Sequence, residues 1–191
     1  MQPKKIAIFA SGGGSNADNI IKYFKDKAEI ATIELVLTNN PDAAVIKKAR
    51  DSSIPVLVFD KKVFKETNKI VNLLENLAID LIILAGFLWL VPENLVRAFP
   101  TKIINIHPAL LPKFGGKGMF GIHVHEAVYN SEETQTGITI HYVNEHYDEG
   151  KHIAQFSFEL SNSDTPKTIE AKIHALELAN FPRVIETLCL S

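Results

Sequence analysis

Ile103-Ile104-Asn105-Ile106-His107-Pro108 is the stretch that decides the fold of this chain and places its chemistry. Its isoleucines predict a buried strand, which Pro108 ends because it has no backbone N–H to donate. Asn105 and His107 are two residues apart, so both side chains lie on one face at the carboxyl end of that strand. Ligands of open α/β sheets bind at this edge. An amide beside an imidazole can hold an oxyanion and move a proton; the alternative is a strand end that hydrogen-bonds its own loop.

The segments on both sides of this strand predict the rest of the sheet. Apolar runs alternate with helical stripes before it, which is typical of a parallel sheet with right-handed crossovers. Two segments after it alternate like antiparallel strands. The fold class expected is therefore α/β, a Rossmann-like, mostly parallel sheet flanked by helices, with an antiparallel C-terminal extension. The expected strands are 6–10, 33–38, 56–59, 81–85, 136–143 and 153–160, and the expected helices are 15–24, 42–50, 64–77, 92–99, 123–130 and one that starts at 166 and is interrupted by Pro182.

The composition excludes several classes of protein. With 191 residues, 46% of them hydrophobic, the chain suits a single domain, 1–191. Its net charge is −2 and its lysines and arginines are spread out, which argues against nucleic-acid or membrane partners. The N-terminus lacks the pattern of a signal peptide, and Cys189 is the only cysteine, so a reducing, cytoplasmic location is expected. The oligomeric state is left open.

A glycine-rich turn, Ser11-Gly12-Gly13-Gly14-Ser15-Asn16, follows the first strand and opens a helix. Glycines allow backbone N–H groups to approach an anion, and the helix N-terminus favours one, so a phosphate is the expected ligand. The turn also matches a dinucleotide pattern, through Gly12, Gly14 and Ala17. However, the second strand runs into Asn39-Asn40-Pro41, without the acid that a ribose would require. A single phosphate is favoured over NAD, and a turn that binds nothing is the alternative.

Two further loops are candidates for contact with a ligand. Residues 86–92 are unusually apolar for a loop, which indicates either the wall of a pocket for a flat aromatic ligand or packing against the next helix. Residues 115–121 contain four glycines, so they form either a loop over the site or a surface insertion. Lys113 and Lys117 could meet the phosphate from this loop. His123 and His125 lack the spacing of a known metal motif, so no metal is expected.

Several segments together resemble one family, the folate-dependent formyltransferases, and within it those of purine biosynthesis that act on glycinamide ribonucleotide. The resemblance covers nearly the whole chain. It is carried by Ala10-Ser11-Gly12-Gly13-Gly14-Ser15-Asn16, Leu84-Ala85-Gly86-Phe87, Ile104-Asn105-Ile106-His107-Pro108-Ala109-Leu110-Leu111-Pro112 and Tyr147-Asp148-Glu149-Gly150.

The resemblance implies that a formyl group moves from 10-formyltetrahydrofolate, a co-substrate, to the amine of glycinamide ribonucleotide. It implies that Asn105 and His107 stabilise the oxyanion, that His107 assists proton transfer, and that Asp148 supports His107 in its protonated form. It also implies that about 1–100 is the half that binds the nucleotide phosphate and that 101–191 is the catalytic and folate-binding half. The implied substrate-binding residues are Gly12, Gly13, Gly14, Ser15, Asn16 and Glu177, and the implied folate-binding residues are Leu88, Trp89, Leu90, Val91, Asn105, Val143, Asn144, Glu145, His146 and Tyr147.

The chain departs from the family where relatives often carry an arginine for the glutamate tail of the folate. Only Lys62 and Lys65 stand near that position, and a lysine cannot form the bidentate fork. Two alternatives remain open: a formyltransferase acting on another amine, such as an amino sugar nucleotide, and a nucleotide-binding module without activity.

Overall fold

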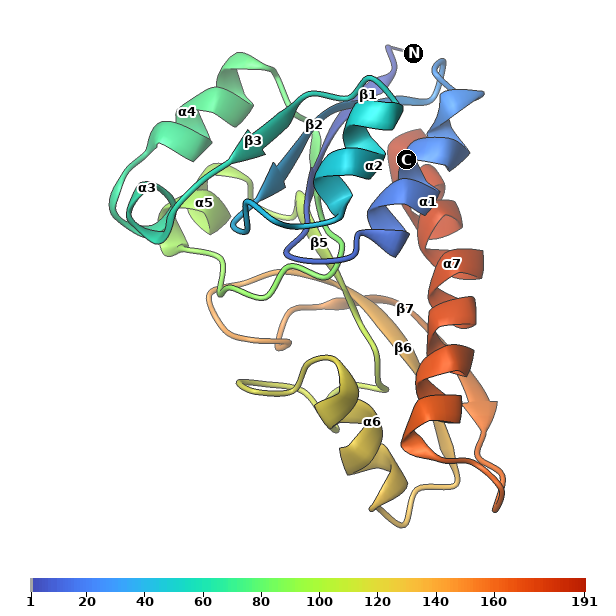
Figure 1. Cartoon of the computed structure of the whole chain (residues 1–191). Coiled ribbons are helices and arrows are strands. Elements are labelled where there is room, and N and C mark those ends of the chain that lie inside the picture. The colour runs from blue at the N-terminus through green and yellow to red at the C-terminus, as the bar shows by residue number, and fades with distance from the viewer. Residues whose placement is uncertain (1) are drawn as a thin grey trace.

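The computed structural model describes residues 2–191 and contains one seven-stranded sheet with helices on both faces (Figure 1). The strand order is β3-β2-β1-β4-β5-β6-β7, with β1 to β5 parallel and β6 and β7 antiparallel, as the expected fold class requires. The strands are β1 Lys4–Phe9, β2 Ala31–Thr38, β3 Val56–Val58, β4 Leu81–Leu84, β5 Ile103–His107, β6 Gln135–Tyr142 and β7 His152–Glu159; the helices are α1 Ser15–Lys25, α2 Val45–Asp51, α3 Lys61–Glu66, α4 Lys69–Asn76, α5 Glu93–Ala98, α6 Ile122–Tyr129 and α7 Pro166–Leu190.

Alternation along the central strands builds two hydrophobic cores. In β1, Ile6 and Ile8 face the core beneath α1, α2 and α7, whereas Ala7 and Phe9 face the core beneath α3, α4 and α5. All four side chains are completely buried, because successive residues of a strand point to opposite faces and both faces are covered. Figure 1 shows α7 running along one side of the sheet, from α1 to the end of the molecule that carries α6.

The strand order places a crevice beside β1. The chain passes from β1 outward to β2 and β3, then returns to pair β4 with the other edge of β1. The loops after β1 and β4 therefore diverge to opposite faces, and ligands of α/β sheets bind at such a switch point. Because β6 runs antiparallel to β5, it places His141 opposite Asn105 and Thr139 opposite His107.

The expected single helix over 64–77 is wrong: the segment forms two short helices, α3 and α4. Thr67 ends α3 with an extended backbone, φ −135° and ψ 160°. Its hydroxyl donates to the carbonyl of Val63 at 2.7 Å and accepts from the backbone N–H of Lys69 at 3.3 Å. The threonine side chain thus supplies hydrogen bonds that compete with a continuous helix.

The expected interruption at Pro182 is also wrong, because α7 continues through it to Leu190. Proline has no N–H, so the carbonyl of Leu178, four residues earlier, loses its partner within the helix. Asn19 on α1 replaces that partner, since its Nδ2 donates to the Leu178 carbonyl at 2.8 Å. Within residues 2–191, no helix has both the length and the apolar character needed to cross a membrane.

Candidate active site

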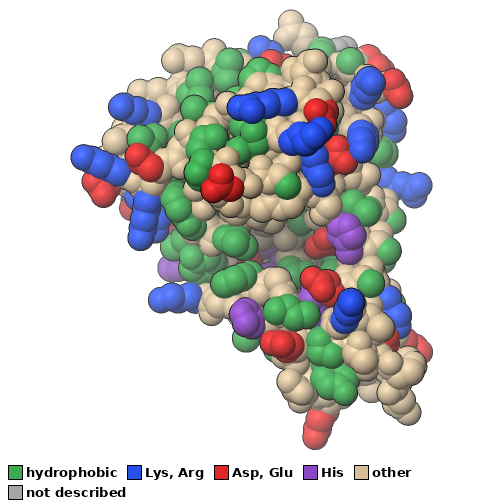
Figure 2. Space-filling view, viewed as in Figure 1, with side chains coloured by type: hydrophobic (Ala, Val, Ile, Leu, Met, Phe, Trp, Pro, Cys, Tyr) green, Lys and Arg blue, Asp and Glu red, His purple; other side chains and the backbone are tan. Residues whose placement is uncertain are grey.

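A cavity of about 620 Å³ opens at the switch point between β1 and β4. Figure 2 shows hydrophobic side chains gathered across the waist of the molecule, between the part that holds most of the sheet and the part that holds α6. The cavity brings together residues predicted from separate segments of the sequence. Those lining it are Gly12, Gly13, Gly14, Ser15, Asn16, Leu88, Trp89, Leu90, Val91, Asn105, His107, Val143, His146, Tyr147, Asp148 and Glu177.

The glycine-rich turn has the shape of an open cradle at the start of α1. Gly14 is the N-cap of α1 in the left-handed region, with φ 66°, and no side chain caps the helix, so the exposed N–H groups remain available. A Cβ added to Gly12 or Gly13 would meet no atom within 4 Å. The hydroxyl of Ser11 accepts from the backbone N–H of Leu88 at 3.0 Å, which ties this turn to the loop after β4.

Two predicted substrate residues, Asn16 and Glu177, are joined directly although 161 positions separate them. Asn16 Nδ2 donates to Glu177 Oε2 at 2.8 Å, and Asn16 Oδ1 is buried without a partner. Burial raises the pKa of Glu177, against the opposing effects of the bond from Asn16 and of the nearby His174. Glu177 therefore places a carboxylate beside the cradle, which can accept hydrogen bonds from the hydroxyl groups of a sugar.

The apolar loop after β4 is partly packed in the core and partly lines the cavity. Phe87 is buried in an aromatic cluster and meets Phe9 edge-on, with ring centroids 5.3 Å apart. Leu88, next in sequence, lines the cavity and is 50% exposed. Trp89 lines the cavity with one part and packs against Phe59 with another, at 6.1 Å between ring centroids. Core packing thus holds the loop in place while part of it forms an apolar wall.

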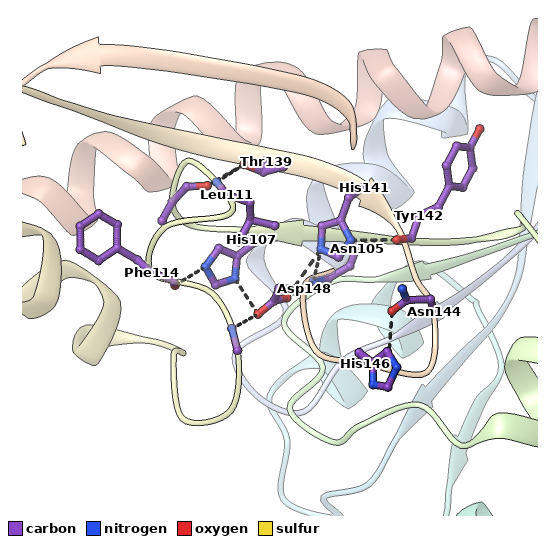
Figure 3. Close-up of polar contacts among 12 residues, drawn as sticks. Asn105, His107, Leu111, Phe114, Thr139, His141, Tyr142, Asn144, His146 and Asp148 are labelled. Carbon is purple, nitrogen blue, oxygen red and sulfur yellow. Dashed lines mark hydrogen bonds and ion pairs between the residues drawn. The ribbon is translucent and has the colours of Figure 1, made fainter. Parts of the chain in front are cut away.

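His107 is buried at the end of β5, with an oxygen acceptor near each ring nitrogen. Its Nε2 lies 2.8 Å from the carbonyl oxygen of Phe114, and its Nδ1 lies 3.5 Å from Asp148 Oδ2 (Figure 3). Only the imidazolium form could donate to both oxygens. Because the contact with Phe114 is the shorter, it assigns a proton to Nε2 and leaves Nδ1 facing the carboxylate.

Asp148 lies in the loop between β6 and β7, and a donor from another segment lies near each of its carboxylate oxygens. Its Oδ2 accepts from the backbone N–H of Gly116 at 2.9 Å. Its Oδ1 lies 3.5 Å from Asn105 Nδ2 and 3.6 Å from His141 Nε2. Burial raises the pKa of Asp148, but His141, His107 and the N–H of Gly116 together outweigh it, so the pKa lies below its ordinary value. Asp148 is therefore ionised at neutral pH.

Asp148 favours the protonated form of His107, as expected, but burial of the imidazole opposes it. Burial lowers the pKa of His107, and this effect exceeds the opposing effects of the Asp148 charge and the Phe114 carbonyl. The free energy lost when an imidazolium is removed from water is larger here than the free energy gained from its attraction to one neighbouring carboxylate. His107 is thus neutral at neutral pH, with an acceptor set that would stabilise a proton once it arrives.

His141 fixes the amide of Asn105. The Nδ1 of His141 lies 2.9 Å from the carbonyl of Tyr142, an acceptor, so Nδ1 carries the proton. Its Nε2 is then an acceptor and receives the Nδ2 hydrogen of Asn105 at 3.1 Å. The remaining hydrogen on Asn105 Nδ2 points toward Asp148 at 3.5 Å, a contact long enough to be exchanged for one with a ligand.

Sequence reasoning missed His141. The register of β5 against β6 was the signal that could have found it, because that register pairs His141 with Asn105. His125 and Glu170 also line the cavity without having been predicted. His125 is 3% exposed, and its Nδ1 has no partner. No group of three His, Cys, Asp or Glu side chains within residues 2–191 has an arrangement that could hold a metal ion.

Two of the predicted folate residues do not reach the cavity. Asn144 and Glu145 lie in the same loop as Val143, His146 and Tyr147, which line it. Asn144 Oδ1 instead accepts from the backbone N–H of His146 at 3.0 Å, as Figure 3 shows. This hydrogen bond is made within the loop, so the side chain of Asn144 stabilises the loop conformation.

Comparisons with known proteins agree with this geometry. Residues 4–185 match the formyl transferase family. A phosphoribosylglycinamide formyltransferase of Bacillus subtilis is 38% identical over 97% of this chain and 94% of its own length. The chain belongs to the phosphoribosylglycinamide formyltransferase family. The solved structure of the family member from Bacillus halodurans matches with a TM-score of 0.86 and 36% identity, covering 97% of this chain and 95% of that one.

The family also includes longer proteins. A chloroplastic phosphoribosylglycinamide formyltransferase of Arabidopsis thaliana is 41% identical to 97% of this chain. The chain spans 65% of the length of that relative. Residues 4–185, which match the formyl transferase family, contain the glycine-rich turn, the end of β5 and the loop between β6 and β7, and so include every segment that lines the cavity.

Proposed function

We propose that this protein transfers the formyl group of 10-formyltetrahydrofolate to the amine of glycinamide ribonucleotide, a step of purine biosynthesis. The observation that carries the proposal is the convergence of Asn105, His107 and Asp148 on one cavity, between a phosphate cradle and an apolar wall. Such a cavity can hold a phosphorylated amine and a flat aromatic donor side by side. The names of the phosphoribosylglycinamide formyltransferases described above support the ribonucleotide as the acceptor of a formyl group.

In the proposed reaction, the amine nitrogen forms a bond to the formyl carbon and an oxyanion develops. Asn105 stabilises that charge with the hydrogen it now directs toward Asp148. A single donor of this kind typically lowers a barrier by ~2.7–4 kcal/mol. The bond from the formyl carbon to the folate nitrogen then breaks, and the proton lost by the amine moves to that nitrogen.

His107 assists this proton transfer through Nδ1, because Nε2 is held by the carbonyl of Phe114. A neutral imidazole can accept the proton of the attacking amine, and the charge of Asp148 stabilises the imidazolium so formed. Once Nδ1 carries the proton, Asp148 also orients the ring, because Nδ1 lies 3.5 Å from Asp148 Oδ2. General acid–base help of this kind contributes ~10²–10⁴-fold in rate.

Binding is divided between the two halves of the chain in this proposal. Residues 1–100 supply the cradle at Gly12 to Asn16, and 101–191 supply the catalytic groups and much of the folate pocket. The division is not strict, because Leu88 to Val91 also line the pocket and Glu177 on α7 reaches the ribonucleotide end. We further propose that the enzyme works in the cytoplasm with small-molecule substrates, as its charge distribution and single cysteine favour.

The test is an assay of the purified chain with 10-formyltetrahydrofolate and two acceptors, glycinamide ribonucleotide and an amino sugar nucleotide. Formylation of the ribonucleotide that depends on His107 supports the proposal. Turnover of the amino sugar nucleotide alone would favour the other acceptor. If turnover is unchanged in His107→Ala, the measured activity comes from a contaminating enzyme. The protein would then be a nucleotide-binding module without activity. The relatives support the ribonucleotide and give no support to either alternative.

A further inference from the structure

Lys117 is the only lysine or arginine that lines the cavity within residues 2–191. Three carboxylates, those of Asp148, Glu170 and Glu177, line the same cavity. Both proposed substrates carry anionic groups, a phosphate on the ribonucleotide and a glutamate carboxylate on the folate. The N–H groups of the glycine-rich turn favour a phosphate, but the three carboxylates oppose any anion, so a cation in the cavity strengthens the binding of such groups.

Lys117 lies on the glycine-rich loop without an ion-pair partner. No carboxylate in residues 2–191 lies within 4.0 Å of its Nζ. Lys113, four residues earlier, is paired instead, with its Nζ 2.5 Å from Glu133 Oε1. Lys62 and Lys65, the other candidates for an anionic tail, do not line the cavity. Within the described residues, Lys117 is thus the one lysine or arginine that lines the cavity, and it has no ion-pair partner.

The backbone around Lys117 is fixed by its neighbours. The N–H of Gly116 donates to Asp148 Oδ2 at 2.9 Å, one residue before Lys117. Gly116 and Gly118 have φ values of 98° and 92°, which side chains rarely allow. A Cβ on Gly115 would come within 2.5 Å of the side chain of Leu111, so the loop also packs closely there. These contacts hold Lys117 over the cavity beside the catalytic carboxylate.

We propose that Lys117 binds an anionic group of a bound substrate and so provides the positive charge that the rest of the cavity lacks. The inference rests on the proposed function, because that function supplies the anions. The group is either the phosphate of the ribonucleotide or a carboxylate of the folate tail. Both are oxygen anions that an ammonium group recognises as a point charge.

The experiment measures binding of glycinamide ribonucleotide and of a folate by calorimetry, together with kcat/KM for each, in four proteins. These are the wild type, Lys117→Ala, Lys117→Arg and Lys113→Ala, the last being a matched control on the same loop. We expect Lys117→Ala to weaken one substrate about tenfold, as loss of a charge-assisted contact does. We expect Lys117→Arg to keep most of the affinity and Lys113→Ala to match the wild type.

Two truncated substrates identify the anion. If Lys117 binds the phosphate, the difference between wild type and Lys117→Ala disappears with the riboside that lacks the phosphate. If it binds the tail, the difference disappears with a folate analogue that lacks glutamate. Binding of both substrates within twofold of wild type in Lys117→Ala overturns the inference, as does an equal loss in Lys113→Ala. A wild type that binds the ribonucleotide but transfers no formyl group refutes the proposed function instead, while the binding data still test Lys117.

Discussion

The Nε2 of His141 lies 3.1 Å from the Nδ2 of Asn105, across the antiparallel pair of β5 and β6. Because the other ring nitrogen of His141 donates to the carbonyl of Tyr142, this contact orients the Asn105 amide with its hydrogens toward the cavity side that Asp148 shares. His141 is a positioning residue in this arrangement. It determines which end of the amide an oxyanion would meet.

Two replacements of His141 distinguish the contributions of its two hydrogen bonds, because each variant can keep only one of them. In His141→Gln, the side-chain end can accept from Asn105 near the former Nε2 position, whereas Asn at 141 reaches only the former Nδ1 position. We expect His141→Asn to lower kcat about tenfold or more with little change in KM, and His141→Gln to restore most of it. Steady-state kinetics and melting temperatures of both variants provide the measurement. Equal kcat in the two variants, at equal folded fraction, would contradict the positioning role.

Asp148→Asn keeps the shape of the side chain and removes its charge. We expect kcat to fall ~10²–10⁴-fold, because the imidazolium of His107 would lose its stabilising anion in the transition state. Folate affinity should change far less. Kinetics combined with folate titration checks this, and a variant that loses thermal stability but keeps normal turnover in its folded fraction would show that Asp148 is structural.

Substitutions at two glycines of the phosphate cradle should have different effects on stability and on ribonucleotide binding. A side chain on Gly13 enters open space, so Gly13→Val should leave the melting temperature almost unchanged and weaken ribonucleotide binding by obstruction. A Cβ on Gly14 would lie 2.5 Å from the Cβ of Val45, and its φ is 66°, so Gly14→Ala should destabilise the fold by ~1–3 kcal/mol. Calorimetry and denaturant unfolding distinguish them. Unchanged affinity in Gly13→Val would refute the phosphate assignment.

Stability should fall on mild acidification because of two buried histidines. Burial lowers the pKa of His107, and burial likewise lowers that of His125 against the attraction of Glu170. Below pH 6.5 the unfolded chain binds protons that the folded chain does not, so stability rises with pH through this window. Each group contributes at most ~1.4 kcal/mol per pH unit. Denaturant unfolding at several pH values from 5 to 7.5 gives the free energy of unfolding as a function of pH. We expect this free energy to depend less steeply on pH in His125→Gln than in the wild type. An unchanged slope would exclude His125 as a contributor.

Asn19 is expected to stabilise the protein through a contact with α7. In Asn19→Ala the carbonyl of Leu178 loses its donor, which should cost ~1–3 kcal/mol of unfolding free energy. In Pro182→Ala a backbone N–H returns and can bond that carbonyl instead. The double variant should therefore be less destabilised than the sum of the two single changes. Denaturant unfolding of the four proteins forms the cycle, and strict additivity would show that the contact carries no energy.

Local patterns were sufficient for most of the fold. The strand over 103–107 is observed with the predicted bounds, and alternating apolar residues predicted β6 and β7 within a residue or two. The errors occurred where a side chain from the same or another segment completed a hydrogen bond. Thr67 breaks a helix that periodicity alone would continue, and Asn19 lets α7 pass through Pro182.

The class of the sheet, the glycine-rich turn and the position of Asn105 and His107 at a strand end could be predicted from the amino-acid sequence, because these features depend on periodicity and on neighbours in the chain. Resemblance to a family added Asp148, which the residues alone could not pair with His107. Two features follow only from the tertiary structure: His141 orients Asn105, and burial lowers the pKa of His107. Both effects depend on strand register and on exclusion of water, which arise only when segments far apart in the chain pack together.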